Sequence, residues 1–217
     1  MRPRHLIWDW NGTLLDDAWL CRHAINVLLE RRRLPALSEE RYQEIFAFPL
    51  EGYYQAAGFT FETETFDAVG MEFIALYTHQ LRNCHLRQGA RAFLQDAHGS
   101  GLTQAVLSAQ EHGMLNQALA HQGILSFFDL VMGVDSFHAR GKIEQGARLM
   151  EQLRWKPRSC VLVGDTLHDV DVARSLGVDC VLIEGGNQSR SRLAAAGVPV
   201  LADLAALRAE LGLPPEA

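Results

Sequence analysis

Short apolar runs recur along the chain, and a small or polar residue stands at the end of each run or directly after it. They predict strands over residues 5–10, 103–108, 130–133, 159–164 and 179–183. Apolar residues at helical spacing lie between the later runs and predict helices over residues 88–98, 113–122, 143–153 and 169–176. Strands that alternate with helices predict a parallel sheet with right-handed crossovers and helices on its faces.

The region between the first two predicted strands interrupts this alternation. Residues 18–33 have an amphipathic helical pattern, Ser38 offers an N-cap for a second helix, and residues 66–82 form a third long helical pattern. We therefore expect an α/β protein in which a Rossmann-like core carries an inserted all-helical cap. The expected boundaries are residues 1–15 plus 90–217 for the core and residues 16–89 for the cap.

Polar residues stand at the ends of three predicted strands. Asp9, Ser108 and Asp165 each follow an apolar run directly. Because ligands of parallel α/β sheets bind beyond the carboxyl ends of the strands, these side chains are expected to meet at one edge of the sheet. Such a convergence favours an enzyme.

Composition narrows the class of protein further. The chain has 217 residues, of which 48% are hydrophobic and 21% charged, and its net charge is −6. An acidic protein of this kind is not expected to bind nucleic acid or an anionic membrane as its main role. The four cysteines form no CxxC pair, no apolar run reaches membrane-spanning length, and the start lacks a signal-peptide pattern. We therefore expect a cytoplasmic protein with free thiols.

Four short motifs occur in a fixed order. They are Asp-Trp-Asn-Gly-Thr at residues 9–13, Ala-Val-Leu-Ser at 105–108, Gly-Lys at 141–142, and Gly-Asp-Thr-Leu-His-Asp at 164–169. Through them the chain resembles the haloacid dehalogenase-like hydrolases, and in particular the phosphoglycolate-phosphatase-like branch with a helical cap. The resemblance covers nearly the whole chain and implies the core and cap described above.

The resemblance also implies roles for individual residues. Asp9 would be a nucleophile that forms an aspartyl-phosphate. Mg²⁺ would be held by Asp9, the backbone carbonyl of Asn11 and Asp165, with Asp169 supporting the metal site. Phosphoryl-binding roles would fall to Gly12, Thr13, Ser108, Ala109 and Lys142. The implied catalytic residues are Asp9, Asn11, Ser108 and Lys142. The implied substrate is a small phosphorylated metabolite, and the chain would act as a monomer or homodimer.

Each of these residues also has a purely structural interpretation. Asp165 and Asp169 could serve as a helix N-cap and a first-turn acid. Ser108 could be a turn residue, and Lys142 a solvated charge at the start of a helix. A convergence of four ordered motifs favours the catalytic interpretation.

Asn11 departs from the resemblance. Phosphatases of this kind carry Asp at that position, where it protonates the leaving oxygen and later activates water. A carboxamide cannot exchange that proton, and losing such a group costs about 10²–10⁴-fold in rate. The chain could therefore be a slow phosphatase for good leaving groups, form a persistent phospho-enzyme, or bind a phosphate ligand or protein partner without turnover. Deamidation of Asn11-Gly12 is a further hypothesis.

Two related chemistries fit less well. Dehalogenases of this scaffold place an aromatic residue where this chain has Asn11. Phosphonate-cleaving relatives share an Asp-Trp-x-Gly-Thr motif but need a cap lysine, and this chain has no lysine before Lys142.

The predicted cap leaves several roles open. Aromatic residues within 46–54 could line a pocket or form the cap's own core, and the second is favoured. Asp16 and Asp17 lie at the hinge and are expected to cap the first helix rather than contact substrate. Four more side chains are expected to be exposed to solvent, namely Arg22, Arg41, Arg82 and His168. Two tryptophans, Trp8 and Trp10, are expected to pack against the sheet or at the junction of core and cap.

Overall fold

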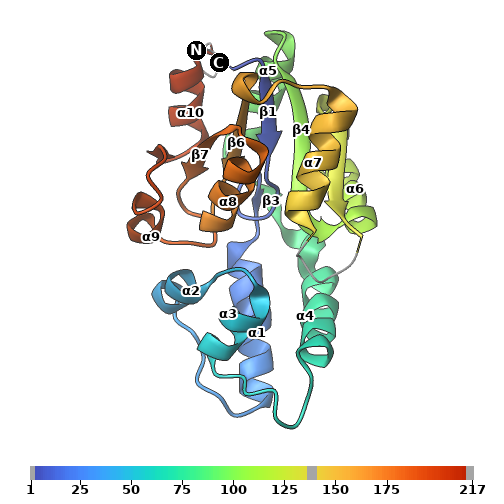
Figure 1. Cartoon of the computed structure of the whole chain (residues 1–217). Helices are drawn as coiled ribbons and strands as arrows, with labels where there is room; N and C mark the ends of the chain where they lie inside the picture. Colours follow the sequence, from blue (N-terminus) through green and yellow to red (C-terminus); the bar gives the residue numbers. More distant parts are fainter. Residues whose placement is uncertain (1–2, 136–140, 214–217) are drawn as a thin grey trace.

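The structure is a computed structural model that describes residues 3–135 and 141–213. Its centre is a parallel six-stranded sheet with the strand order β5-β4-β1-β6-β7-β8 (Figure 1). The strands are β1 (His5–Trp8), β4 (Thr103–Glu111), β5 (Leu130–Val134), β6 (Cys160–Gly164), β7 (Asp179–Ile183) and β8 (Val200–Leu201). β1 lies between β4 and β6, with Ile7 opposite Ala105 on one side and Leu162 on the other. The predicted parallel α/β sheet is confirmed.

Helices cover both faces of this sheet. Leu6 and Trp8 of β1 belong to an apolar cluster with α5, α6 and α10, whereas Ile7 belongs to a second cluster with α7, α8 and α9. Side chains alternate between the two faces of a strand, so β1 is buried on both. The helices are α5 (Ala90–Gly99), α6 (His112–His121), α7 (Lys142–Leu153), α8 (Leu167–Leu176), α9 (Arg190–Ala194) and α10 (Leu204–Leu211), with the 3₁₀ turns η2 (Leu125–Phe127) and η3 (Pro157–Ser159).

Between β1 and β4 the chain forms a helical cap beside the carboxyl end of β1 (Figure 1). Its helices are α1 (Ala18–Arg31), α2 (Glu39–Ile45), α3 (Leu50–Ala57) and α4 (Phe66–Gln80), followed by the 3₁₀ turn η1 (Leu81–Asn83). β2 (Leu15–Asp16) and β3 (His85–Leu86) pair antiparallel where the chain enters and leaves this region. The exact domain boundaries stay a prediction.

The cap has an apolar core of its own. Ile25 and Leu28 of α1 pack with Tyr53, Tyr54 and Val69 in one cluster. Burying side chains of this size stabilises a fold by about 1.5–3 kcal/mol each. The α2 N-cap prediction is confirmed, because the Ser38 side chain accepts a hydrogen bond from the Arg41 N–H.

In residues 3–135 and 141–213 we find no helix that is both long and apolar enough to cross a membrane. The four cysteines are free, as expected, and Cys84, Cys160 and Cys180 are buried.

Candidate active site

The loop after β1 sets the position of Asp9 at the edge of the sheet. The backbone N–H of Asp9 donates to the carbonyl of Val163 at 2.9 Å, which continues the β1–β6 pairing by one residue. Gly12 then turns the chain with a φ of +78°. A Cβ at Gly12 would collide with the Asp165 carboxylate. The turn therefore requires glycine both for its backbone angle and for space.

Thr13 connects two of the predicted metal ligands. Its buried hydroxyl lies 3.1 Å from Asp9 Oδ2 and 3.1 Å from Asp165 Oδ1. A hydroxyl has one proton, so it can donate to one of these carboxylates at a time. Thr13 thereby fixes the spacing of the two acids.

Lys142 begins α7 and points inward rather than into solvent. Its ammonium lies 2.5 Å from Asp9 Oδ1 and 2.7 Å from Asp169 Oδ1, and the residue is 2% exposed. Burial alone would lower its pKa, but the two carboxylates outweigh burial and raise the pKa of Lys142 above its ordinary value. The ammonium is therefore a fixed positive charge beside Asp9, and the interpretation of Lys142 as a solvated helix-start charge is wrong.

Three buried carboxylates form a cluster here, and two of them, Asp9 and Asp169, contact the ammonium. Oxygen atoms of Asp9, Asp165 and Asp169 all lie within 4.8 Å of one another. Burial raises the pKa of Asp9 to about 6, although Lys142 opposes the shift, and burial with the neighbouring acids also raises the pKa of Asp165. One ammonium does not neutralise three acids. An oxygen donor set with excess negative charge is the environment that a hard divalent cation such as Mg²⁺ fits.

Asp169 combines a structural contact with its place in this cluster. Its Oδ2 accepts hydrogen bonds from the backbone and hydroxyl of Thr166, which forms the capping box of α8. Burial would raise the pKa of Asp169, but Lys142 and the Thr166 hydroxyl outweigh burial and lower it. The predicted first-turn position of Asp169 is confirmed, whereas Thr166 rather than Asp165 is the N-cap residue.

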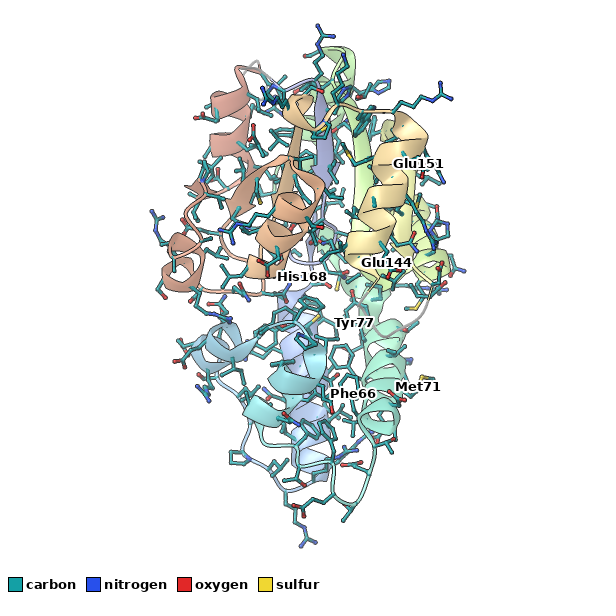
Figure 2. All side chains as sticks on the ribbon, in the orientation of Figure 1. Phe66, Met71, Tyr77, Glu144, Glu151 and His168 are labelled. Atoms are coloured by element: carbon teal, nitrogen blue, oxygen red, sulfur yellow. The ribbon has the colours of Figure 1, made fainter. Side chains whose placement is uncertain are left out.

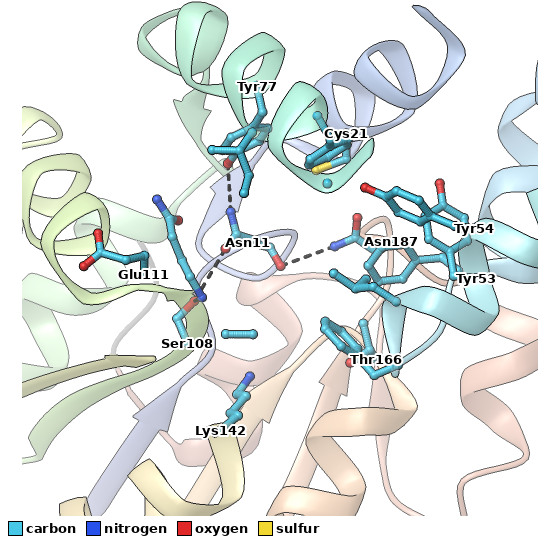
Figure 3. A pocket seen from close by; sticks show the side chains of 18 of the residues that line it. Asn11, Cys21, Tyr53, Tyr54, Tyr77, Ser108, Glu111, Lys142, Thr166 and Asn187 are labelled. Atoms are coloured by element: carbon cyan, nitrogen blue, oxygen red, sulfur yellow. Dashed lines mark hydrogen bonds between the residues drawn. The ribbon is translucent and has the colours of Figure 1, made fainter. Parts of the chain in front are cut away.

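Ser108 and Asn11 meet on the other side of Asp9. The Ser108 hydroxyl lies 3.5 Å from Asn11 Oδ1 and accepts a hydrogen bond from the Gln110 N–H at 3.1 Å. The Asn11 amide donates to the Tyr77 hydroxyl at 2.8 Å (Figure 3). It also donates to Asp17 Oδ2 at 2.7 Å. The amide nitrogen is thus committed to the cap side, and the amide oxygen faces Ser108.

The expectation that the Asp17 side chain caps the first helix is wrong. Asp17 occupies the N-cap position of α1, but its side chain makes no capping hydrogen bond. The buried carboxylate instead accepts from the Gly12 N–H at 2.8 Å and the Tyr77 hydroxyl at 2.7 Å, besides Asn11. The partners that replace the helix amides come from the loop after β1, through Asn11 and Gly12, and from α4, through Tyr77. Burial raises the pKa of Asp17.

Asn187 joins cap and core beside Asp165. Its N–H and its side-chain amide donate to Asp165 Oδ2 at 2.6 Å and 2.9 Å. Its Oδ1 accepts from the hydroxyl of Tyr42 on α2 at 2.7 Å. We did not predict Asn187, Tyr42 or Tyr77 as site residues. Asn187 carries a recognisable signal, since it follows the apolar run of β7 after two glycines.

A cavity of about 440 Å³ opens above Asp9 between core and cap. Among the predicted substrate-binding residues, Ser108, Ala109 and Lys142 line it, whereas Gly12 and Thr13 lie outside its lining. Its cap wall is mostly apolar. That wall includes Phe46, Phe48, Leu50, Tyr53, Tyr54, Phe66, Phe73 and Ile74. Tyr53 and Tyr54 therefore belong to the cap core and also face the cavity.

The remaining candidates lie away from the cavity. Arg22 pairs with Glu39 and Arg41 with Glu44 on the cap surface, and Arg82 is exposed. His168 is half-buried rather than exposed, because its ring stacks on Phe48 at 4.6 Å between ring centres. Figure 2 shows His168 at the edge of the core that faces the cap. Trp8 and Trp10 are fully buried in the first core cluster, as predicted.

Comparison with known proteins identifies the family. The chain matches the family described as haloacid dehalogenase-like hydrolase over residues 6–183. The chain belongs to this family, and the resemblance inferred from the four motifs is confirmed.

The proteins similar to this chain include one named as a kinase and others named as phosphatases. The chain is 27% identical to the tyrosine-protein kinase PtkA of Mycobacterium tuberculosis, covering 85% of this chain and 63% of that protein. The solved structure of PtkA superposes with a TM-score of 0.82 at 26% identity, covering 98% and 99% of the two chains. The probable phosphatase IndB of Dickeya dadantii is 27% identical over 94% and 90% of the two chains. The phosphoglycolate phosphatase of Rhodobacter capsulatus is 25% identical over 83% and 84%.

Proposed function

We propose that the chain is a Mg²⁺-dependent phosphohydrolase that cleaves a small phosphorylated metabolite through an aspartyl-phosphate intermediate. The observation that carries this proposal is the contact of 2.5 Å between the Asp9 carboxylate and the Lys142 ammonium at the base of the cavity. A carboxylate placed there can attack phosphorus, and the adjacent fixed cation offsets the charge of the phosphoryl group. The names of IndB and of the Rhodobacter phosphatase support the same class of reaction.

The first step forms a bond between an Asp9 oxygen and phosphorus while the bond from phosphorus to the leaving oxygen breaks. Lys142 and the Ser108 hydroxyl would contact phosphoryl oxygens. Asn11 has no proton to give near neutral pH, so the leaving oxygen departs with its electron pair and is protonated by solvent. Water then attacks the aspartyl-phosphate, which releases inorganic phosphate and restores the Asp9 carboxylate.

Asp9, the Asn11 carbonyl and Asp165 would hold Mg²⁺, with Asp169 supporting the site, and Mg²⁺ would offset negative charge shared by phosphate and carboxylates. Thr13 fixes the spacing of Asp9 and Asp165, and Asn187 fixes the orientation of Asp165. The chain's own contribution is thus a rigid set of oxygen atoms.

The test is Mg²⁺-dependent phosphate release from acetyl phosphate and from an alkyl phosphomonoester. We expect turnover by the native protein, faster with acetyl phosphate because that leaving group needs little protonation. Asp9→Asn should reduce the rate by at least about 10⁴-fold, since the nucleophile is lost. Thermal melts of both proteins check that the variant is folded. Release that persists in Asp9→Asn would contradict the proposal.

The presence of Asn11 favours a second candidate function, in which the protein binds a phosphate ligand or a partner without turnover. Without an acid and base at this position the site can retain binding after losing hydrolysis. This candidate predicts that Mg²⁺ with fluoroberyllate raises the melting temperature while neither phosphate compound is consumed. PtkA, which is 27% identical to this chain, is named for a different phosphate chemistry.

A further inference from the structure

The wall of the cavity opposite Asp9 consists largely of apolar and aromatic side chains. Phe48, Ile74 and Met114 line the cavity and belong to none of the three apolar clusters found among the described residues. Phe48 also packs against the rings of Phe46 and His168, but part of each of the three side chains faces the cavity. An apolar group of a ligand would cover them, because removal of such surface from water is favourable.

The charges around the cavity point the same way. Of the described residues that line it, Lys142 is the one with a positive charge, and it is already paired with Asp9 and Asp169. Glu111 and Asp67 are acidic lining residues on the α6 and α4 sides. In the described part of the chain, a carboxylate on the leaving group would meet no free cation. A small anionic substrate such as phosphoglycolate therefore fits this wall poorly.

Two neutral polar groups also line the cavity, one from the cap and one from β4 of the core. The Tyr53 hydroxyl and the Gln110 side-chain amide are buried, line the cavity and have no hydrogen-bond partner within the described residues. Buried polar groups are costly unless they are paired. A ligand that carries a neutral hydroxyl or amide group would satisfy them.

The chemistry at Asn11 adds an independent constraint on the leaving group. Without a general acid the leaving oxygen must depart as an anion. Phenols ionise at a pH of about 10, as tyrosine does, whereas alcohols are much weaker acids. A phenolate therefore leaves far more readily than an alkoxide, and a phenyl ring is also a group that the cap wall would cover.

We propose that the substrate is an aryl phosphate, a phosphomonoester of an aromatic hydroxyl group, whose ring packs against Phe48, Ile74 and Met114. This inference rests on the proposed function and specifies its substrate class. Asp9 would bond to phosphorus as the aryl oxygen departs with its electron pair, the phenolate takes a proton from solvent, and water later releases phosphate.

Four compounds separate ring binding from leaving-group chemistry. Phenyl phosphate and benzyl phosphate carry a ring, whereas acetyl phosphate and phosphoglycolate do not. Phenyl and acetyl phosphate have good leaving groups, and the other two have poor ones. We expect KM values about tenfold lower for the two ring compounds, kcat higher for phenyl than for benzyl phosphate, and the highest kcat/KM for phenyl phosphate. The highest kcat/KM for phosphoglycolate would overturn the inference and leave the proposed function intact.

Binding gives a test that does not depend on turnover. Calorimetry with Mg²⁺ compares phenylphosphonate with phosphonoacetate, which lack a cleavable ester. We expect phenylphosphonate to bind about tenfold tighter, and equal or weaker binding would overturn the inference even if no compound is hydrolysed. Absence of all turnover together with tight phenylphosphonate binding would reject the proposed hydrolysis alone.

A charge placed on the wall should reverse the preference. Ile74→Lys is expected to raise kcat/KM for phosphoglycolate and to lower it for phenyl phosphate, each by about threefold to tenfold. Leu125→Lys is the matched control, since Leu125 is 37% exposed and lies outside the cavity lining. It should change neither value. Changes of the same sign for both substrates in Ile74→Lys would contradict the inference.

Discussion

The two sides of the cavity differ in how their side chains are held. On the core side, Asp9, Asp165, Asp169 and Lys142 are buried and joined to one another or to backbone by hydrogen bonds and ion pairs. On the cap side, Phe48 and Ile74 face the cavity outside any apolar cluster of the described residues. The core side therefore has one favoured arrangement, whereas the cap side can adapt to a ligand. We infer that the core fixes the reaction and the cap selects the substrate.

Removing Lys142 should have the largest effect on the core side. Lys142→Met keeps the length of the side chain but leaves three buried acids without their cation. We expect phosphate release to fall by about 10²–10³-fold, similar to the loss of a group that stabilises developing charge. The measurement is kcat at saturating Mg²⁺ for acetyl phosphate.

Lys156→Met is the matched control. Lys156 lies between the C-terminal end of α7 and the start of η3, at the opposite end of α7 from Lys142, so the rate should stay unchanged. A Lys142→Met rate within threefold of the native rate would mean that the core side tolerates the loss of its fixed charge.

Asn11→Asp tests whether core and cap are independent. The new carboxylate would replace an amide that donates to Asp17 at 2.7 Å, so two acids would lie in contact. We expect Asn11→Asp alone to gain little activity and to be less stable by about 1.5–3 kcal/mol. The pair Asn11→Asp with Asp17→Asn should restore the donor and raise phosphate release about 10–100-fold above the single variant.

The measurement is a double-mutant cycle in kcat and in urea unfolding, with Asp17→Asn alone as the fourth member. Additive effects would contradict the coupling, and so would full activity of Asn11→Asp without the second change.

The pH dependence follows from Asp9. Its pKa is raised to about 6, mainly by burial, so lowering the pH through 6 protonates the nucleophile and should reduce kcat/KM about tenfold for each unit below that value. The contribution of Asp9 to folding stability changes with pH in the opposite direction to kcat/KM. Because the folded pKa lies above the unfolded value of 3.8, the contribution of Asp9 to stability is complete below about pH 4 and is lost as pH rises through 6.

A pH profile of kcat/KM for acetyl phosphate checks the first sign, and a comparison of the melting temperatures of native protein and Asp9→Asn without metal, as a function of pH, checks the second. Mg²⁺ titrations of the melting temperature at pH 5 and pH 7.5 give an additional test. We expect a larger stabilisation by Mg²⁺ at pH 7.5, where the carboxylates are ionised. A larger effect at pH 5 would contradict the assigned shift.

Surface charges of the cap should matter least. Arg41→Ala removes an exposed ion pair with Glu44, and such pairs contribute about 0–1 kcal/mol. We expect KM for any anionic substrate to stay within twofold of the native value. A large increase in KM, measured beside Glu44→Ala, would show that this arginine reaches the substrate despite its place on the cap surface.

The sequence predicted what depends on local pattern. Asp9 directly follows β1 at the sheet edge, as predicted. Ser108 also faces the site, but β4 continues to Glu111, and Ser108 lies where its register against β5 shifts. The site contacts that were missed span large sequence separations, such as Tyr77 with Asp17 and Asn187 with Asp165. Tyr77 looks like an ordinary apolar position of α4, and no local spacing marks its hydroxyl.

The short elements were missed for a different reason. α3 follows Pro49 and has Gly52 in its first turn, and both residues weaken a helical pattern. Its stability comes from tertiary packing of Tyr53 and Tyr54 in the cap core. The prediction for Asp17 was wrong because its carboxylate could either cap α1 locally or accept hydrogen bonds from distant residues. The sequence pattern shows only the local option.

The hydrogen bond from Tyr42 to Asn187 has a thermodynamic consequence. Asn187 also holds Asp165, so one side chain senses both the position of the cap and the orientation of a predicted metal ligand. If the cap moves away, Asp165 loses part of its support. By linkage, whatever favours the closed cap should tighten metal binding, and the metal should favour closure by the same factor. Substrate and metal would then bind cooperatively, and Tyr42→Phe should weaken that cooperativity without removing either site.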